Sequence, residues 1–282
     1  MKRQKRAAAI HDISCFGKCS LTVALPILSA AGIEAAVIPT AVLSTHTGGF
    51  TDFTYRDLTA DLRPIMAHWK RLGLQFDAVY SGYLGSLEQV SIVRDFIGTF
   101  RSEGTLVLVD PAMADDGKLY KTFEPPFVEE MKGLCTHADL IVPNITEAAM
   151  LTGETYREGP YDKAYIERLL HGLLSLGAKQ AVLTGVWFDE KQYGAASLTL
   201  GDNEPHYIFS PKVEGFYHGT GDVFASALLA ARMRGRSLEE SARMAVDLTC
   251  GSILRTKAAG TDLRFGVNFE EGLPDFIRAL GL

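Results

Sequence analysis

Short apolar runs alternate along the chain with longer segments in which apolar residues recur at intervals of three and four. The runs are rich in β-branched residues and cover positions 7–13, 35–43, 77–84, 105–111, 138–144 and 180–185. Two of the longer segments, 86–104 and 165–180, have the helical interval. Continuous apolar strands separated by helices indicate a parallel sheet that is covered on both faces. The pattern therefore predicts an α/β protein.

Polar residues follow most of the predicted strands. They are Asp12, positions 44–46 and 81–83, Asp110, Asn144 and Thr184. In open α/β sheets, ligands bind outside the carboxyl ends of the strands. We therefore expect these positions to line one crevice.

The segment 187–210 has a different pattern, because apolar and polar residues alternate on both sides of a "GDN" turn. It predicts a β-hairpin or meander added to the edge of the sheet. The long apolar stretch 21–43 is interrupted by Pro26, Gly32, Glu34 and Pro39. It therefore predicts a helix, a turn and a strand, and no membrane span. Since no repeat or linker divides the chain, we expect one domain over residues 1–282.

Composition and charge narrow the class of partner. The chain has 282 residues, of which 47% are hydrophobic, and this is enough to bury a full core. A net charge of -6 argues against a nucleic-acid surface, which needs clustered positive charge. The basic start "MKRQKR" is followed by polar residues too soon for a signal peptide, so we expect a solvated tail and a cytoplasmic protein. A small-molecule substrate is the expected partner.

The four cysteines, Cys15, Cys19, Cys135 and Cys250, form no CxxC pair and have no matching histidine spacing. We expect reduced thiols and no zinc site.

One local pattern asks for a chemical explanation: the glycine-rich turn in "HGTGDVFASALLAA", directly before an apolar helix. The pair Gly17-Lys18 does not belong to a Walker loop, because Asp12 stands where the first glycine of that motif is required. The glycine-rich turn itself is not a dinucleotide fingerprint, because Phe224 stands where that motif requires glycine or alanine. The first amides of a helix are unpaired and bind anions, and Gly219 and Gly221 allow the backbone to approach closely. Asp222 fits a favourable charge at a helix start. It also fits a base that takes a proton from a hydroxyl attacking a phosphoryl group.

This stretch resembles the GTGD motif of the ribokinase-like small-molecule kinases. The segments "LSTHTGG", "SGYLGS", "VDPAM", "PNITEAAMLTG" and "RTKAAGTDLRFG" are similar to the pyridoxal kinase branch, in the same order from "AIHDIS" to about residue 267. The resemblance implies a ribokinase-like fold, with a mostly parallel sheet flanked by helices. It also implies ATP-dependent phosphorylation of the 5'-hydroxymethyl group of pyridoxal, pyridoxamine or pyridoxine, and a homodimer.

The resemblance also implies a role for each matching position. Asp222 would be the catalytic base. The anion hole would consist of Gly219, Thr220 and Gly221, with Thr220 also close to ATP. The other ATP-binding residues would be Asp110, Asp115, Asn144 and Thr184. Magnesium would be held by Asp110 and Glu147, with Asn144 acting largely through water, and a monovalent cation such as K⁺ is a further expected cofactor. The vitamin pocket would be lined by Asp12, Thr45, His46 and Tyr83.

Four of these residues also have an ordinary structural interpretation. Asn144 and Glu147 fit a helix start, with the asparagine as cap and the acid in the first turn. His46 fits a hydrogen-bonded turn histidine, and Tyr83 fits core packing.

One position departs from the pyridoxal kinase pattern, which usually has a serine where this chain has Asp12. Hydroxymethylpyrimidine kinases have an aspartate in a comparable turn, so a hydroxymethylpyrimidine kinase of thiamine synthesis is the alternative enzyme. A non-catalytic vitamer-binding regulatory protein is the alternative of another class. The intact GTGD argues against that class, because a binding protein needs no base at the anion hole.

Overall fold

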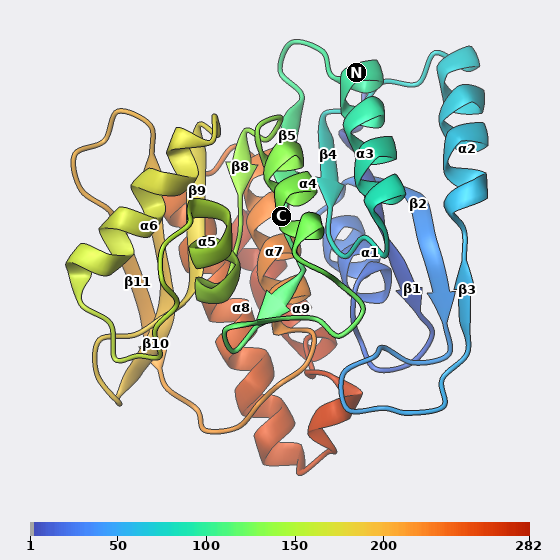
Figure 1. Ribbon diagram of the computed structural model, residues 1–282. Coiled ribbons are helices and arrows are strands. Elements are labelled where there is room, and N and C mark those ends of the chain that lie inside the picture. The colour runs from blue at the N-terminus through green and yellow to red at the C-terminus, as the bar shows by residue number, and fades with distance from the viewer. Residues whose placement is uncertain (1–2) are drawn as a thin grey trace.

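A nine-stranded sheet forms the centre of the molecule, and the apolar runs of the sequence supply most of its strands (Figure 1). The computed structural model describes residues 3–282. In chain order the strands are β1 (Arg6–Ser14), β2 (Glu34–Leu43), β3 (Tyr55–Asp57), β4 (Ala78–Ser81), β5 (Leu106–Val109), β8 (Leu140–Ile141), β9 (Gln180–Val186), β10 (Gln192–Thr199) and β11 (His206–Pro211). Their spatial order is β11-β10-β9-β8-β5-β4-β1-β2-β3. A separate two-stranded sheet joins β6 (Ala114–Asp115) to β7 (Lys118–Leu119).

The strands from β9 to β2 in this order are parallel, whereas both edges of the sheet are antiparallel. At one edge, β10 pairs with β9 and β11, which confirms the hairpin predicted for 187–210. At the other edge, β3 pairs with β2. The sequence pattern did not predict β3, because its three residues are exposed and lack an apolar run.

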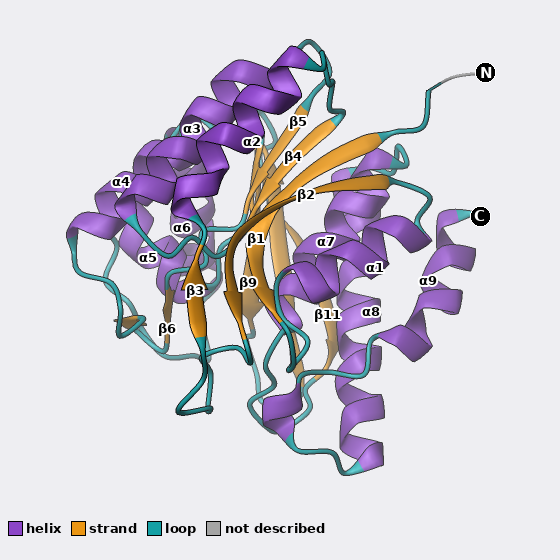
Figure 2. Cartoon of the chain, turned by 90° about the vertical axis from the view of Figure 1, so that its right-hand side faces the viewer, coloured by secondary structure: helices purple, strands orange, loops and turns teal. Residues whose placement is uncertain are grey.

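Helices cover both faces of the sheet (Figure 2). One face carries α2 (Thr59–Arg71), α3 (Leu87–Phe100), α4 (Pro126–Cys135), α5 (Ile145–Thr152) and α6 (Lys163–Ser175). The other carries α1 (Leu21–Ala30), α7 (Thr220–Met233), α8 (Leu238–Ala259) and α9 (Leu273–Leu280). Short 3₁₀ turns lie at Leu263–Phe265 and Glu270–Gly272. Among the described residues, no helix is both long and apolar enough to cross a membrane.

Because both faces of the parallel strands are covered, successive residues of one strand enter different cores. In β4, Val79 packs in the core beneath α2–α6, and Tyr80 packs in the core beneath α1 and α7–α9. The alanine- and leucine-rich run of α7 is buried on all sides from Val223 to Ala231. A helix that is apolar all round belongs in an interior, and this burial fixes the start of α7 relative to the sheet.

The strand order reverses at β1, which lies between β2 and β4. The following helices, α1 and α3, therefore lie on opposite faces, and a crevice opens between the ends of β1 and β4. The register of β1 with β2 also shifts between His11 and Ile13, on either side of Asp12. Irregularities of this kind redirect side chains near binding sites.

The prediction of a solvated tail over residues 1–6 is wrong for its last two residues, Lys5 and Arg6. Arg6 is the first residue of β1 and forms an ion pair with Glu34, 2.9 Å between Nε and Oε1. Lys5 donates a hydrogen bond to the carbonyl of Met233. Residues 1–2 lie outside the described residues. The tail is shorter than predicted because strand pairing with β2 extends to the basic end of the apolar run.

The free thiols agree with the prediction of reduced cysteines, since no disulfide joins the four cysteines, all of which lie in the described part of the chain.

Candidate active site

The turn before α7 has the geometry that its glycines predict. Gly219 is the N-cap residue, with φ of 76°, a left-handed conformation that favours glycine. A Cβ atom at this position would lie 2.1 Å from the carbonyl oxygen of Lys18, so the turn packs directly on the loop after β1. The hydroxyl of Thr220 donates to the carbonyl of Tyr217 at 3.2 Å. No side chain in the described residues caps this helix, and its first amides are available to an anion.

Asp222 lies in the first turn of α7, and its carboxyl binds a proton more tightly than an exposed aspartate does. Burial and the charge of Asp12 together raise the pKa of its carboxyl to about 7, although the backbone N–H of Ser20 lowers it. A carboxylate with a pKa near neutral pH accepts a proton far more readily than an exposed aspartate. This is the property expected of a base.

Asp12 is held by two hydroxyl groups. Only 4% of the residue is exposed. Its Oδ1 accepts from Ser20 Oγ at 2.6 Å, and its Oδ2 accepts from Ser14 Oγ at 2.9 Å. Burial raises the pKa of the Asp12 carboxyl, and these hydrogen bonds oppose the effect. The charge of Asp12 reaches Asp222, but each oxygen of Asp12 already accepts a hydrogen bond from a serine hydroxyl.

Asn144 and Glu147 form the helix start that was one of their two interpretations. Asn144 Oδ1 accepts from the N–H of Glu147 at 2.9 Å, and Glu147 Oε2 accepts from the N–H of Asn144 at 2.9 Å, which is a capping box. Glu147 is only 3% exposed, and its Oε1 accepts from the N–H of Met113 at 3.0 Å. Burial raises the pKa of Glu147 to about 8, in spite of these hydrogen bonds. Burial, followed by the charges of Glu147 and Asp222, raises the pKa of Asp110.

The carboxylates of Asp110 and Glu147 repel each other, and a magnesium ion would be attracted to both. Their like charges destabilise the ionised forms, and a divalent cation between them would relieve this repulsion. Within residues 3–282, no three acidic, histidine or cysteine side chains converge as a dedicated metal site. Magnesium is commonly bound by one or two carboxylates together with water and substrate phosphates. The pair therefore suits an ion that arrives with a nucleotide.

Asp115 and Thr184 lie on the side of the site that includes β9. Thr184 forms a parallel bridge with Asn144, and its hydroxyl donates to the carbonyl of Pro143 at 3.3 Å. Asp115, in β6, accepts from the N–H of Asp116 at 3.0 Å, and burial raises its pKa. Its charge acts on Tyr193 of β10. These residues therefore lie near the antiparallel edge of the sheet.

Thr45, His46 and Tyr83 lie on the opposite side. His46 Nε2 donates to the carbonyl of Arg264 at 2.6 Å, and its Nδ1 accepts from the N–H of Gly48 at 3.1 Å. Burial lowers the pKa of His46, so the neutral ring links two loops and agrees with the turn-histidine interpretation. Within the described chain, the buried hydroxyl of Thr45 has no hydrogen-bond partner. Tyr83 stacks on Phe123, with ring centroids 5.6 Å apart, and the charge of Asp12 acts on its hydroxyl.

Asp222 relates the acids of the two groups. The charge of Asp12 raises the pKa of Asp222, and the charge of Asp222 raises the pKa of Asp110. These three acids are therefore close enough to act on one another, as expected for one crevice along the carboxyl ends of the strands.

Two residues of the crevice were missed at the level of sequence. Tyr120 follows β7. Its pKa is raised mainly by burial and also by the charges of four acids, Glu147, Asp115, Asp110 and Asp222. Ser20 lies between Asp12 and Asp222. Neither residue belongs to a motif with a chemical meaning, and only the fold brings them to the acids.

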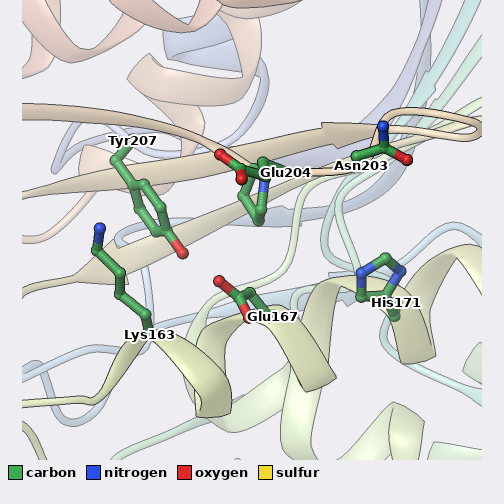
Figure 3. Close-up of a pocket in the computed structure, with 7 residues that line it drawn as sticks. Lys163, Glu167, His171, Asn203, Glu204 and Tyr207 are labelled. Carbon is green, nitrogen blue, oxygen red and sulfur yellow. The ribbon is translucent and has the colours of Figure 1, made fainter.

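A separate cavity of about 370 Å³ lies between α6 and the β10–β11 hairpin (Figure 3). Its lining includes Lys163, Glu167, His171, Glu204 and Tyr207. It contains none of the predicted site residues.

Comparisons with known proteins show the family and the fold of the chain. A family model described as phosphomethylpyrimidine kinase matches residues 25–265. The chain is similar to the crystal structure of pyridoxal kinase from Lactobacillus plantarum, with 33% identity, a TM-score of 0.90 and 98% of each chain covered. A Bacteroides thetaiotaomicron protein, provisionally named a phosphomethylpyrimidine kinase and crystallised with pyridoxal, is 37% identical, with a TM-score of 0.92 over 97% of this chain and 96% of its own. The pyridoxine/pyridoxal/pyridoxamine kinase of Bordetella avium is 29% identical over 80% of this chain and 77% of its own length.

Proposed function

This chain belongs to the phosphomethylpyrimidine kinase family, together with pyridoxal kinases, and is a ribokinase-like phosphotransferase. On that premise we propose that it transfers the terminal phosphoryl group of ATP to the 5'-hydroxymethyl group of pyridoxal, pyridoxamine or pyridoxine. The observation that supports this most strongly is Asp222, a partly buried acid of pKa about 7 in the first turn of α7. A base is most effective when its pKa lies near the working pH.

In the proposed reaction, Asp222 accepts the proton of the substrate hydroxyl as its oxygen attacks the γ-phosphorus of ATP. The bond between that phosphorus and the β,γ-bridging oxygen breaks, and ADP leaves with the electron pair. Charge develops on the oxygens of the transferred group, and the amides of Gly219, Thr220 and Gly221 at the start of α7 would stabilise it. The buried body of α7 holds these groups rigidly, which limits reorganisation during the reaction.

The nucleotide is proposed to lie over the half of the crevice formed by Asp110, Asp115, Asn144 and Thr184. Asp110 and Glu147 would hold magnesium, which when bound neutralises phosphate charge. Because both oxygens of Glu147 already accept backbone N–H groups, contact through water suits it better than direct coordination.

The vitamin is proposed to bind on the other half, beside Thr45, His46 and Tyr83. The unpartnered hydroxyl of Thr45 can donate to or accept from a ring substituent. His46 shapes the pocket through the two loops that it links, since both its nitrogens are already bonded. Contact between Asp12 and the ring remains a prediction.

An assay of ADP release with pyridoxal, pyridoxamine, pyridoxine and hydroxymethylpyrimidine tests this proposal. We expect the three B6 vitamers to support turnover with a kcat/KM at least about tenfold above that of the pyrimidine. Turnover with the pyrimidine alone would favour the second candidate, a hydroxymethylpyrimidine kinase. That candidate is supported by the description of the matching family model and by the aspartate at position 12.

Four further properties belong to the same proposal. They are a homodimeric assembly, a cytoplasmic location, a requirement for a monovalent cation such as K⁺, and a single domain over residues 1–282. The last is supported by the one sheet to which both halves of the crevice belong.

A further inference from the structure

Ser20 has a backbone conformation that is rare for any residue other than glycine. Its φ is 56° and its ψ is -127°. Lys18, two residues earlier, also has a positive φ, of 51°. Non-glycine residues persist in such conformations only where their surroundings hold them there, and they gather at functional sites. The loop from Gly17 to Ser20 lies directly against the turn before α7, as the close approach of Lys18 to Gly219 shows.

Two of the polar groups of Ser20 are held by the fold. Its hydroxyl donates to Asp12 Oδ1 at 2.6 Å, a short hydrogen bond to a buried carboxylate. Its carbonyl accepts from the N–H groups of Val23 and Ala24, at 3.0 and 2.9 Å, and opens α1. The hydroxyl therefore does not cap α1 in the way a serine before a helix usually does. It is directed to Asp12 instead.

The third polar group, the backbone N–H, acts on the carboxylate of Asp222 and lowers its pKa. The loop that carries it packs on Gly219, three residues before Asp222. We propose that Ser20 is a positioning residue for Asp222, and that Asp12 acts through it: the hydrogen bond that Ser20 donates to Asp12 helps to hold the strained backbone of Ser20 in a conformation that presents its N–H to the base. This inference rests on the proposed role of Asp222. It gives Asp12 a function that needs no contact with substrate, and it explains why a costly backbone conformation carries a serine.

The proposal predicts an unusual order among substitutions at position 20. Ser20→Ala removes the hydroxyl but keeps the strain, so the backbone relaxes and the N–H leaves Asp222. Ser20→Gly removes the same hydroxyl, yet glycine adopts a positive φ without strain. We expect kcat to fall roughly tenfold to hundredfold in Ser20→Ala, with KM for the vitamer within about threefold of wild type. We expect the kcat of Ser20→Gly to be several-fold above that of Ser20→Ala.

The role of Asp12 is tested by substituting it in the wild-type protein and in the Ser20→Gly variant. Asp12→Ala removes the anchor and should lower kcat about as much as Ser20→Ala does, whereas Asp12→Asn keeps an acceptor oxygen for Ser20 and should recover most of the loss. In the Ser20→Gly background, Asp12→Ala should cause a much smaller further decrease, since glycine needs no anchor. The matched control is Ser14→Ala, which removes a hydroxyl from the other oxygen of Asp12 and should leave kcat near wild type.

Two outcomes would overturn the inference. One is equal or greater loss of kcat in Ser20→Gly than in Ser20→Ala. The other is an effect of Asp12→Ala that falls on KM and is the same in both backgrounds, which would mean that Asp12 contacts the vitamin.

Hydrogen exchange at the backbone amide of position 20, measured by NMR without substrate, makes the test independent of the proposed function. We expect exchange about tenfold faster in Ser20→Ala and Asp12→Ala than in wild type and Ser20→Gly. Equal exchange in all four folded proteins would contradict the positioning role. A wild-type protein that releases no ADP with any vitamer would refute the proposed function, but would leave this comparison valid.

Discussion

Replacing Asp222, the proposed base, with asparagine should have two opposite effects, a loss of activity and a gain in stability. The carboxylate of Asp222 is destabilised in the folded protein, because burial and the charge of Asp12 raise its pKa from 3.8 to about 7. Asparagine keeps the size and one acceptor oxygen of the side chain but carries no charge and accepts no proton. An aspartate whose only role is to favour a helix start would give a loss of stability instead.

The stability effect depends on pH in a defined direction. Between about pH 4 and pH 7 the folded protein binds a proton at Asp222 that the unfolded chain has lost, so the free energy of unfolding decreases as the pH rises. Each unit of pKa difference corresponds to about 1.4 kcal/mol, so a rise of about three units gives an upper limit of about 4 kcal/mol above pH 7. Solvent reaches part of Asp222 and reduces this value, and we expect a gain of about 1–3 kcal/mol for Asp222→Asn.

Urea unfolding at about pH 4.5 and about pH 8 measures this gain, and kcat is measured at the higher pH. Asp222→Asn should lower kcat by about a hundredfold or more, while nucleotide and vitamer still bind. The matched control is Asp162→Asn at the N-cap of α6, because a hydrogen bond from the N–H of Tyr165 lowers the pKa of Asp162. That variant should gain no stability as the pH rises. Near-normal kcat in Asp222→Asn, or a stability gain that does not increase with pH, would refute the reasoning.

Three further predictions follow from the same site. Gly219→Ala should lower kcat at least about tenfold and the free energy of unfolding by about 2 kcal/mol, because its Cβ would lie 2.1 Å from the carbonyl oxygen of Lys18. The control for stability is Gly221→Ala, whose Cβ would have no atom within 4 Å, and equal free energies of unfolding in the two variants would contradict the prediction. Glu147→Gln should raise the KM for ATP with magnesium at least about fivefold while the KM for the vitamer changes less than about twofold, and equal changes in both would count against its assignment to the nucleotide half. Sedimentation at micromolar concentration should show a homodimer, a property expected from family resemblance, and a monomer would contradict it.

The parallel strands and the helices between them were predictable from sequence because burial on both faces leaves a strong apolar pattern. In β5, the run Leu106–Val109 is apolar at every position, and it is followed by Asp110 where the sheet ends. Edge elements lack this signal. Strand β3 is defined by its pairing with β2 rather than by its own exposed residues, so no local pattern could reveal it.

The candidate site was predictable wherever a motif fixes the local backbone. The glycines before Asp222 predicted an open helix start, and the structure has Gly219 in the left-handed conformation. Ser20 could not be found in this way, since a serine before an apolar helix predicts an ordinary cap. Its contacts with Asp12 and Asp222 depend on one pair of backbone angles and on the packing of α7 against the loop after β1.

The identity of the phosphorylated product tests the central claim most directly. Wild-type protein and Asp222→Asn are incubated with ATP, magnesium and pyridoxal, and the products are analysed by ³¹P NMR and mass spectrometry. The account predicts pyridoxal 5'-phosphate in an amount equal to the ADP formed by the wild-type protein, and a rate at least about a hundredfold lower in the variant. Phosphate on any other oxygen, ADP without a phosphorylated vitamer, or equal rates in the two proteins would contradict it.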